Sequence, residues 1–311
     1  MSDSGHIVYW KNSINISKIY SISGYSRAKE ATGFYCKELE MAFDAGLPTN
    51  DMPAYICLTH LHNDHVSSLN KMLIENKKQP TIFIPNNNKF EHLLVGMLKY
   101  IYLSSKFIHP ESEKGKQPNS KYPYKIVKLN VGESYKFKET KNGEFYVEGL
   151  PSDHGVESIS FGVYEMRNRC KTEYQNLDKS MYGKLRSDGI DFMEKYRHNI
   201  LCYMSDTSMK AFSLPHSEKI FEYPVVMIEC TFIENDDLSH AKKKNHMHWK
   251  QLEKIMENKP NQFILTHFSK KYTWGEVRGF FDEYFKKNSV PANMILWLHT
   301  GAIKYNTINT I

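Results

Sequence analysis

The stretch from Leu58 to Leu69, LTHLHNDHVSSL, places three histidines and an aspartate within six residues, directly after an apolar run. Imidazole nitrogens and carboxylate oxygens are ligands that suit Zn²⁺ and similar divalent ions. In an extended chain His60 and His62 point to the same side, because side chains alternate with a period of two. Asp64 and His65 follow where a helix begins, and a turn there aims both at a second ion. The stretch therefore predicts a metal site at a strand end; the alternative interpretation is a histidine-rich surface turn.

The composition is that of a globular protein. The chain has 311 residues, of which 41% are hydrophobic and 13% aromatic, which is enough to bury a sizeable core. No membrane span is expected, and the N-terminus lacks the pattern of a secretory signal. Five cysteines without CxxC pairs indicate a reducing intracellular compartment, cytoplasm or nucleus. The net charge of +6 is a mild indication of an anionic partner.

Short apolar runs recur along the chain, and each ends near a residue that binds metal or protons. Runs of this length, rich in Ile, Val, Phe and Tyr, are typical of buried strands. The runs, each with the residue that follows it, are 55–58 with His60, 145–150 with His154, 200–204 with Asp206, 225–228 with Glu229, and 263–265 with His267. Because active-site residues tend to lie on loops at strand ends, we expect these five ends to meet at one edge of the layers.

Helical patterns lie between some of these runs, over 67–74, 89–103, 248–256 and 274–285. Strands mixed with helices on this scale predict an α/β layered fold. Residues 104–124 are rich in Lys, Pro and Ser and are expected to form a surface loop. The charged, tyrosine-containing segment 165–199 is expected to protrude as an insertion within one domain spanning 1–311.

Several segments together resemble ribonuclease Z, a tRNA 3′-end processing endonuclease family of the metallo-β-lactamase superfamily. THLHNDHV (59–66) resembles the metal motif of the superfamily, and YMSDTS (203–208) resembles its bridging-aspartate motif. ECTF (229–232), NHMHW (245–249) and ILTHFSKKY (264–272) are similar to segments of the ribonuclease Z family, and AFDAG (42–46) and SISFGVY (158–164) also fit. Residues 167–190 resemble the short insertion of its single-domain form. The resemblance covers residues 20 to 275.

The resemblance implies a metallo-β-lactamase αββα four-layer sandwich with two Zn²⁺ ions per subunit, Mn²⁺ or Fe²⁺ being the alternatives. It assigns His60, His62 and His154 to one ion, Asp64, His65 and His267 to the other, and Asp206 to both. Asp64 would also orient the attacking hydroxide. His246 would be the catalytic histidine outside the metal ligands, held by Glu229. The candidates for contact with the substrate are Ser269, Lys271, Tyr272 and His248.

The chain departs from the family pattern at a few positions. Ile228 stands where a histidine often precedes the glutamate, and Ser205 replaces the glycine before the bridging aspartate. Lys271 stands where arginine is more usual, and the loop His246-Met247-His248 leaves open which ring is the general acid. None of these changes removes a metal ligand, so activity is expected.

Taken singly, several of these residues also have ordinary structural interpretations. Asp206 suits a helix N-cap, Glu229 suits a buried strand carboxylate, and His154 suits a solvated turn. His248 is also compatible with a ring that faces solvent from a helix.

The resemblance implies a metal-dependent endoribonuclease that cleaves the 3′ trailer from precursor tRNA and leaves a 3′-hydroxyl on the tRNA. It further implies a homodimer in which the arm 165–199 of one subunit grips tRNA cut by the other. The lysine runs 242–244 and 270–271 flank the proposed catalytic loops and favour contact with phosphates. Two alternatives stay open: a dinuclear-zinc phosphodiesterase or esterase acting on small molecules, and a non-catalytic RNA-binding relative.

Overall fold

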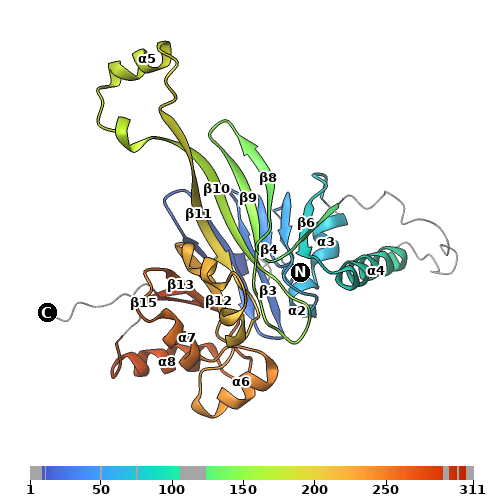
Figure 1. The fold of residues 1–311 in the computed structure, drawn as a ribbon. Helices are drawn as coiled ribbons and strands as arrows, with labels where there is room; N and C mark the ends of the chain where they lie inside the picture. Colours follow the sequence, from blue (N-terminus) through green and yellow to red (C-terminus); the bar gives the residue numbers. More distant parts are fainter. Residues whose placement is uncertain are drawn as a thin grey trace.

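The strands of the protein form two sheets that face each other, as the computed structural model in Figure 1 shows. The structure describes residues 9–10, 12–49, 51–74, 76–105, 124–289, 294–299 and 301–305. The first sheet has the order β1 (Ser13–Asn15), β2 (Ser21–Arg27), β3 (Ala31–Cys36), β4 (Met41–Phe43), β5 (Tyr55–Cys57), β6 (Thr81–Pro85) and β7 (Lys125–Leu129). The second has the order β15 (Gly301–Tyr305), β14 (Met294–Leu298), β13 (Gln262–Thr266), β12 (Val225–Glu229), β11 (Met193–Tyr203), β10 (Ser160–Cys170), β9 (Gly143–Leu150) and β8 (Ser134–Thr140).

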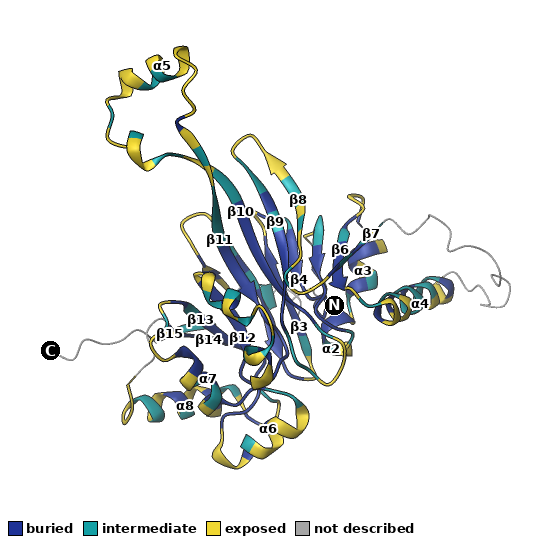
Figure 2. Ribbon diagram, in the orientation of Figure 1, coloured by how far each residue is buried: buried dark blue, intermediate teal, exposed yellow. Residues whose placement is uncertain are grey.

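The core between the sheets is built from alternate residues of the strands, because successive side chains point to opposite faces. In β12, Val225 and Met227 belong to the cluster between the sheets, whereas Val226 and Ile228 belong to a second cluster on the outer face. The same alternation places Phe83 of β6 between the sheets. The central strands are therefore buried along most of their length, as Figure 2 shows.

Helices cover the outer face of each sheet. Side chains of α3 (Leu69–Ile74) and α4 (Asn88–Ser105) pack on the first sheet, and those of α7 (Trp249–Met256) and α8 (Trp274–Phe285) pack on the second. The remaining helices are α2 (Asn63–Val66), α5 (Lys179–Ser187) and α6 (Leu238–Lys244), with the 3₁₀ turns η2 (Thr172–Tyr174), η3 (Met209–Ser213), η4 (Ser217–Glu222) and η5 (Asn235–Asp237). The layers follow the order helix, sheet, sheet, helix, which confirms the predicted αββα fold class.

A long hairpin extends from the second sheet. β10 and β11 pair in antiparallel register from Phe161 opposite Tyr203 to Cys170 opposite Met193, whereas β9 accompanies β10 only as far as Arg167. The hairpin carries η2 and α5 at its tip, and α5 buries none of its side chains (Figures 1 and 2). This protrusion falls within the segment 165–199 that the sequence singled out.

The five predicted strand runs are all confirmed as strands, and the four helical patterns coincide with α3, α4, α7 and α8. Most of the predicted loop 104–124 lies outside the described residues; its first two residues are the last two of α4. None of the helices within the described ranges combines the length and apolar character that a bilayer crossing requires.

Candidate metal centre

Loops that follow parallel strands bring the predicted site residues to one edge of the sheets. β4 and β5 are parallel neighbours in the first sheet, and β11, β12 and β13 are parallel neighbours in the second. Because parallel strands end at the same edge, the loops that follow them lie side by side. The residues delivered there are Asp44 after β4, His60 to His65 after β5, His154 after β9, Asp206 after β11, Glu229 at the end of β12, and His267 after β13.

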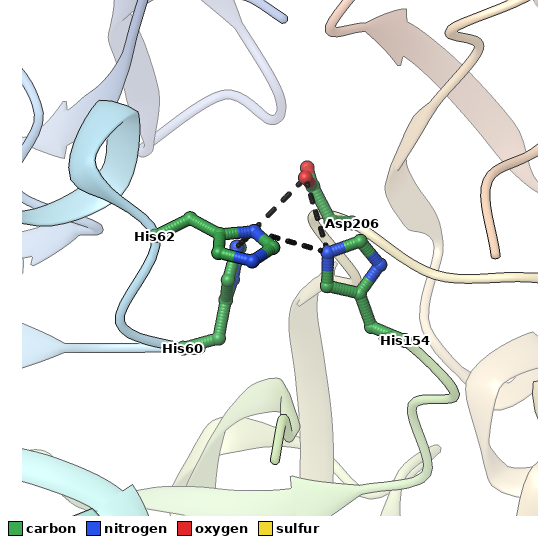
Figure 3. A group of neighbouring side chains, drawn as sticks. All are labelled: His60, His62, His154 and Asp206. Atoms are coloured by element: carbon green, nitrogen blue, oxygen red, sulfur yellow. Dashed lines mark hydrogen bonds and ion pairs between the residues drawn. The ribbon is translucent and has the colours of Figure 1, made fainter. Parts of the chain in front are cut away.

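The first set of ligand atoms, the outer group, consists of the imidazoles of His60, His62 and His154 (Figure 3). His60 Nε2 lies 3.1 Å from His62 Nδ1, and His154 Nε2 lies 3.2 Å from the same atom. In a tetrahedral site with Zn–N bonds of about 2.0–2.1 Å, two ligand nitrogens lie roughly 3.3 Å apart. The three rings therefore have nearly the spacing that one tetrahedral ion requires.

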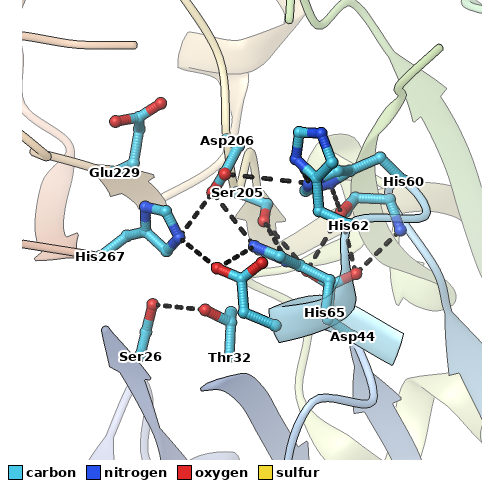
Figure 4. A network of polar contacts seen from close by, with 12 residues as sticks. Ser26, Thr32, Asp44, His60, His62, His65, Ser205, Asp206, Glu229 and His267 are labelled. Carbon is cyan, nitrogen blue, oxygen red and sulfur yellow. Dashed lines mark hydrogen bonds and ion pairs between the residues drawn. The ribbon is translucent and has the colours of Figure 1, made fainter. Parts of the chain in front are cut away.

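The second set, the inner group, consists of Asp64, His65 and His267. Figure 4 labels the two histidines, His65 and His267. Asp64 Oδ2 lies 3.7 Å from His65 Nε2 and 3.5 Å from His267 Nε2. Both histidines are buried, while Asp64 reaches the cavity above them. Two imidazoles and a carboxylate thus converge beside the outer group.

Asp206 turns one carboxylate oxygen toward each group. Its Oδ1 lies 3.4 Å from His65 Nε2 and 3.3 Å from His267 Nε2. Its Oδ2 lies 3.8 Å from both His60 Nε2 and His154 Nε2. A carboxylate held in this way is able to serve as a ligand to both groups at once.

Three buried polar atoms in this cluster have no hydrogen-bond partner among the described residues: His65 Nε2, His267 Nε2 and Asp206 Oδ1. A buried polar atom without a partner costs free energy, so native structures rarely keep one without a reason. All three atoms face the same point, where a single cation would satisfy them together. The residues therefore fit a bound divalent metal ion, and the mixture of imidazole and carboxylate suits zinc, manganese or iron.

Asp44 is the hub of the supporting hydrogen bonds. His65 Nδ1 donates to Asp44 Oδ2 at 2.9 Å, which fixes the tautomer that leaves Nε2 free for a metal. Thr59 Oγ1 donates to Asp44 Oδ1 at 2.8 Å and lies 3.0 Å from His60 Nδ1, so the same carboxylate also steadies the outer group. Tyr203 and Ser205 complete the shell by donating their hydroxyls to Asp44 Oδ2.

The backbone around the site is left-handed at five non-glycine residues: Lys29, Asp44, Ser205, Asn245 and His267. Asp44, Ser205 and His267 have φ values of 56°, 48° and 60°, a conformation that costs free energy for residues with a Cβ. At Ser205, where glycine would adopt this φ without cost, the hydroxyl bond to Asp44 at 3.0 Å compensates. Gly46 is confined for a different reason, because a Cβ there would lie 1.8 Å from Asp64 O.

Glu229 and His246 form a hydrogen-bonded pair beside the metal ligands. His246 Nδ1 donates to Glu229 Oε1 at 2.7 Å, and Thr207 N donates to the same oxygen at 2.8 Å. Burial lowers the pKa of His246, but the charge and hydrogen bond of Glu229 outweigh it and raise the pKa to about 9. The ring of His246 also lies 4.9 Å from that of His154, between centroids. A protonated imidazole is therefore held at the edge of the outer group.

The pKa values of two of the ligands, His60 and Asp64, suit metal binding. Burial and the neighbouring His65 imidazole keep the pKa of His60 well below its usual range, so this ring is neutral, as a metal ligand must be. Burial opposes the charge on Asp64, but the neighbouring imidazoles of His267 and His65 outweigh it and lower the pKa of Asp64 to about 2. Lys29 N donates to Asp64 Oδ2 at 2.8 Å and fixes the carboxylate.

A cavity of about 770 Å³ opens above the ligands. Its rim is basic and includes Lys29, Lys244, Lys270 and Lys271. Lys271 is paired with Asp237 and Glu234, whereas no ion pair of Lys29 or Lys244 is found within the described residues. Unpaired lysines around a metal-binding floor favour an anionic ligand.

The candidates for substrate contact divide into two pairs. Ser269 and Lys271 line the cavity. Tyr272 does not line it; its ring is buried, and its hydroxyl donates to Asp237 and accepts from Ile233 N at 3.2 Å. Tyr272 therefore supports the loop that carries His267 and does not reach a ligand in the cavity.

His248 does not face solvent, contrary to one expectation from the sequence, and it does not line the cavity where the substrate contacts are predicted. The side chain is fully buried as the N-cap of α7. Its Nδ1 accepts from Lys250 N at 3.1 Å, and its Nε2 donates to Glu234 O at 2.6 Å. Because both ring nitrogens are used in the helix cap, only His246 of this loop reaches Glu229 and the cavity.

Sequence reasoning missed two supporting groups, Asp44 and the backbone N–H of Lys29. Asp44 carries a signal, since it directly follows the strand β4 in the motif AFDAG, just as the metal ligands follow their strands. Lys29 carries none, because a backbone donor in a tight turn leaves no trace in the residue type.

Comparison with known proteins gives the following relatives. No family model matches the chain. It is 26% identical over 245 residues to Ribonuclease Z of Borrelia hermsii (strain HS1 / DAH), which covers 70% of each chain. It is 23% identical over 179 residues to Nuclear ribonuclease Z of Triticum aestivum, which covers 55% of this chain and 90% of that protein. The solved structure of human tRNase Z, short form, aligns with 85% of this chain and 92% of that one, at 14% identity and a TM-score of 0.42.

Proposed function

We infer that this chain is a member of the ribonuclease Z family of the metallo-β-lactamase superfamily, and we propose that it cleaves the 3′ trailer from precursor tRNA and leaves a 3′-hydroxyl. The relatives support the family. One observation carries the reaction: the Glu229–His246 pair stands beside two ligand groups that share Asp206. The leaving group of this cleavage is a ribose 3′ oxygen, which needs a proton, and a site for hydrolysing a phosphodiester needs that donor next to its cations.

We propose two Zn²⁺ ions per subunit, with Mn²⁺ or Fe²⁺ as alternatives. His60, His62 and His154 would hold one, Asp64, His65 and His267 would hold the other, and Asp206 would be shared. When bound, two such ions lower the pKa of water to about 7 and neutralise the charge that grows on a phosphate under attack.

His246 is the proposed general acid. Since Glu229 holds Nδ1, Nε2 is left to face the substrate. The raised pKa, about 9, keeps the ring protonated at neutral pH, so it is ready to protonate the departing 3′ oxygen. Asp64, whose Oδ2 is fixed by Lys29 N at 2.8 Å, positions the attacking water. The phosphodiester thus lies between Asp64 on the attacking side and His246 on the leaving side.

Binding of the tRNA is proposed to rest on backbone phosphates and on shape. Lys29 and Lys244 line the cavity as unpaired cations within the described residues, and Ser269 and Lys271 lie on the same wall. The exposed hairpin tip with η2 and α5, in segment 165–199, is the proposed tRNA-binding arm. We further propose a homodimer in which this arm serves the site of the other subunit.

We propose a reducing compartment, cytoplasm or nucleus, as the place of action. All five cysteines of the chain are free, and four of them are buried. Disulfides are rare where glutathione and thioredoxin keep thiols reduced, so this pattern suits an intracellular enzyme.

The decisive experiment incubates the protein with a 3′-extended tRNA transcript, with and without chelator, and maps the ends. The proposal expects a tRNA with a 3′-hydroxyl, a trailer with a 5′-phosphate, loss of cleavage with chelator, and recovery on adding Zn²⁺. His246→Ala should lower turnover by about 10²–10⁴-fold while both ions stay bound. His248→Asn is a matched control in the same loop, since His248 does not reach the cavity.

The alternative is tested in parallel with bis-p-nitrophenyl phosphate. An endoribonuclease should prefer the precursor tRNA, and its affinity should fall steeply with salt because phosphate contacts release counterions. Efficient cleavage of the small diester together with an intact tRNA precursor would overturn the proposed function in favour of a small-molecule phosphodiesterase.

A further inference from the structure

A second hollow adjoins the main cavity on the side of His62. It has a volume of about 390 Å³, and it shares His62, Gly155 and Val156 with the main cavity. This volume lies within the range of about 300–1,000 Å³ found for pockets that hold small ligands. The hollow is therefore a neighbouring subsite, separated from the proposed cleavage point only by the outer group and the loop after His154.

The walls of the hollow are apolar and partly exposed. Phe90 and Leu93 are i and i+3 on α4, so they lie on the same face of the helix. Leu61 and Val156 approach from the loops that carry the metal ligands. Leu93 is 52% exposed and Val156 is 42% exposed, although both line a concavity next to a strongly polar centre. Exposed apolar side chains that cluster in a hollow indicate a binding site more strongly than exposed apolar side chains scattered singly over a surface.

The rim of the hollow is polar and fixed. Asn87 Oδ1 accepts from Lys89 N at 2.9 Å and from Phe90 N at 3.1 Å, and Asn87 Nδ2 donates to Glu157 Oε2 at 2.9 Å. These bonds tie the start of α4 to the loop that follows His154. The ammonium of Lys89 is exposed, and no ion pair of it is found in the described part of the chain. An apolar hollow with one unpaired cation matches a nucleotide, which has a flat base and a phosphate.

We propose that this hollow binds the first nucleotide of the trailer, its base against Leu93 and Val156 and its 3′ phosphate near Lys89. The inference rests on the proposed function. In the proposed function the 3′ oxygen of the tRNA lies next to His246, so the tRNA lies on the His246 side of the cleaved phosphate. His246 lines the main cavity but not the hollow, which lies beyond His62. The trailer nucleotide stays attached to the phosphorus and extends toward the hollow.

The test compares two precursor tRNAs, one with an ordinary trailer and one whose first trailer nucleotide is abasic. For Leu93→Ser we expect kcat/KM to fall about 5- to 10-fold on the ordinary substrate, because the base would lose apolar contact area with the Leu93 side chain. On the abasic substrate the variant should equal the wild type. Tyr100→Ser is the matched control, since Tyr100 is 60% exposed on the same helix and lines neither cavity.

Lys89→Ala provides an independent measure. Removing one phosphate contact should reduce the slope of log kcat/KM against log salt concentration by about 1. Lys99→Ala, also on α4, should leave the slope unchanged. Both test residues are exposed, so the variants are expected to fold.

These measurements distinguish a failure of the proposed trailer subsite from a failure of the proposed tRNA cleavage. A wild type that cuts neither precursor overturns the proposed function and the inference with it. A wild type that cuts both equally well overturns the inference alone. Equal losses for Leu93→Ser on the ordinary and the abasic substrate, or no loss on either, also overturn it, because the base would then not contact Leu93.

Discussion

The inner and outer groups use similar ligands, but the fold holds them with unequal firmness. In the inner group His65 is fully buried and His267 is nearly so. The Nδ1 atom of His65 contacts Asp44, and the Nδ1 atom of His267 contacts Thr231. In the outer group His62 is exposed, and no partner for its Nε2 is found within the described residues. The inner group is therefore fixed before a metal binds, whereas one ligand of the outer group gains its position from the metal.

This difference has a physical origin in the layers. The inner ligands lie above the end of the core between the sheets, where Asp44, Tyr203 and Ser205 are packed together. Of the outer ligands, His62 lines both cavities, whereas His60 is fully buried and lines neither. The exposed ligand His62 is thus the one at which the two cavities meet.

The largest effect is expected from Asp206→Ala, which removes the ligand that both groups share. Neither ion should be retained, and kcat/KM on precursor tRNA should fall by more than about 10³-fold, because two-metal chemistry requires both. Metal content measured by mass spectrometry, together with turnover, checks this. Asp236→Ala, an exposed aspartate, is the control. Retention of one full equivalent of metal would mean that one group is complete without Asp206.

Asp44→Asn should weaken metal binding by the inner group and so reduce the difference between the two groups. His65, Tyr203 and Ser205 all donate to Asp44 Oδ2, and Thr59 donates to Oδ1. The amide keeps only one of these two acceptor oxygens and replaces the other with an N–H donor. Loss of such a support typically lowers metal affinity by about 10–100-fold. The inner ion should be affected more than the outer one, which Asp44 supports only through Thr59. Competition with a chromogenic chelator measures both constants, with Asp188→Asn on the arm as the control; a larger loss at the outer group would contradict the assignment.

Partial chelation should separate the two groups in the wild type. We expect metal to leave in two phases, several-fold apart in rate, with the outer ion released first because His62 is exposed and unsupported. Replacing His62 with alanine should remove the fast phase and leave the slow one. A single phase of two equivalents would show that the two groups release metal as one unit.

The smallest effect is expected from a change at Glu148, which belongs to neither ligand group and should affect only the stability of the fold. Burial raises the pKa of Glu148, but hydrogen bonds from Arg197 and Lys219 outweigh it, so the pKa lies below its usual 4.5. A lowered pKa stabilises the fold above pH 4.5, and that contribution is lost as the pH falls through the folded-state pKa. Glu148→Gln should therefore lower the stability of the metal-free protein by roughly 1–3 kcal/mol at pH 7.

Denaturant unfolding at pH 7 and at pH values below 4.5 measures this contribution. The gap between the wild type and Glu148→Gln should shrink as the solution becomes acidic. The metal content of Glu148→Gln at pH 7 should equal that of the wild type. A constant gap across the pH range would assign the effect to packing and not to the charge.

The motif after β5 predicted where the chemistry lies because strand ends and ligand types are both local properties. Runs such as 225–228 and 263–265 have a strand's composition, and the residues that follow them have a ligand's chemistry. Parallel strands of a layered fold end at one edge. Local patterns were therefore enough to predict that residues far apart in the sequence meet there. The αββα order itself came from the resemblance of motifs and not from periodicity.

The errors and omissions concern partners that depend on tertiary contacts. His246 and His248 are two residues apart and chemically identical, and the sequence did not distinguish them. The hydrogen bonds to Glu229 and to Glu234 O decide their roles, and those arise only when α7 starts at Trp249. Asp44 was missed because a single aspartate after a short strand resembles many turns. The hollow beside α4 was likewise beyond reach, since no motif joins Leu93 to Val156.

Gly46 shows that a residue with no ligand or catalytic role can still be intolerant of substitution. Its N–H donates to Thr32 O at 2.9 Å, and its missing side chain lets the backbone of Asp64 pass within contact. Even a methyl group here would push apart the two turns that carry Asp44 and Asp64. In a saturation mutagenesis screen, substitutions of Gly46 should therefore abolish activity as often as substitutions of the ligands. Such a result would reflect the close approach of two backbones at Gly46 and not a direct role in the reaction.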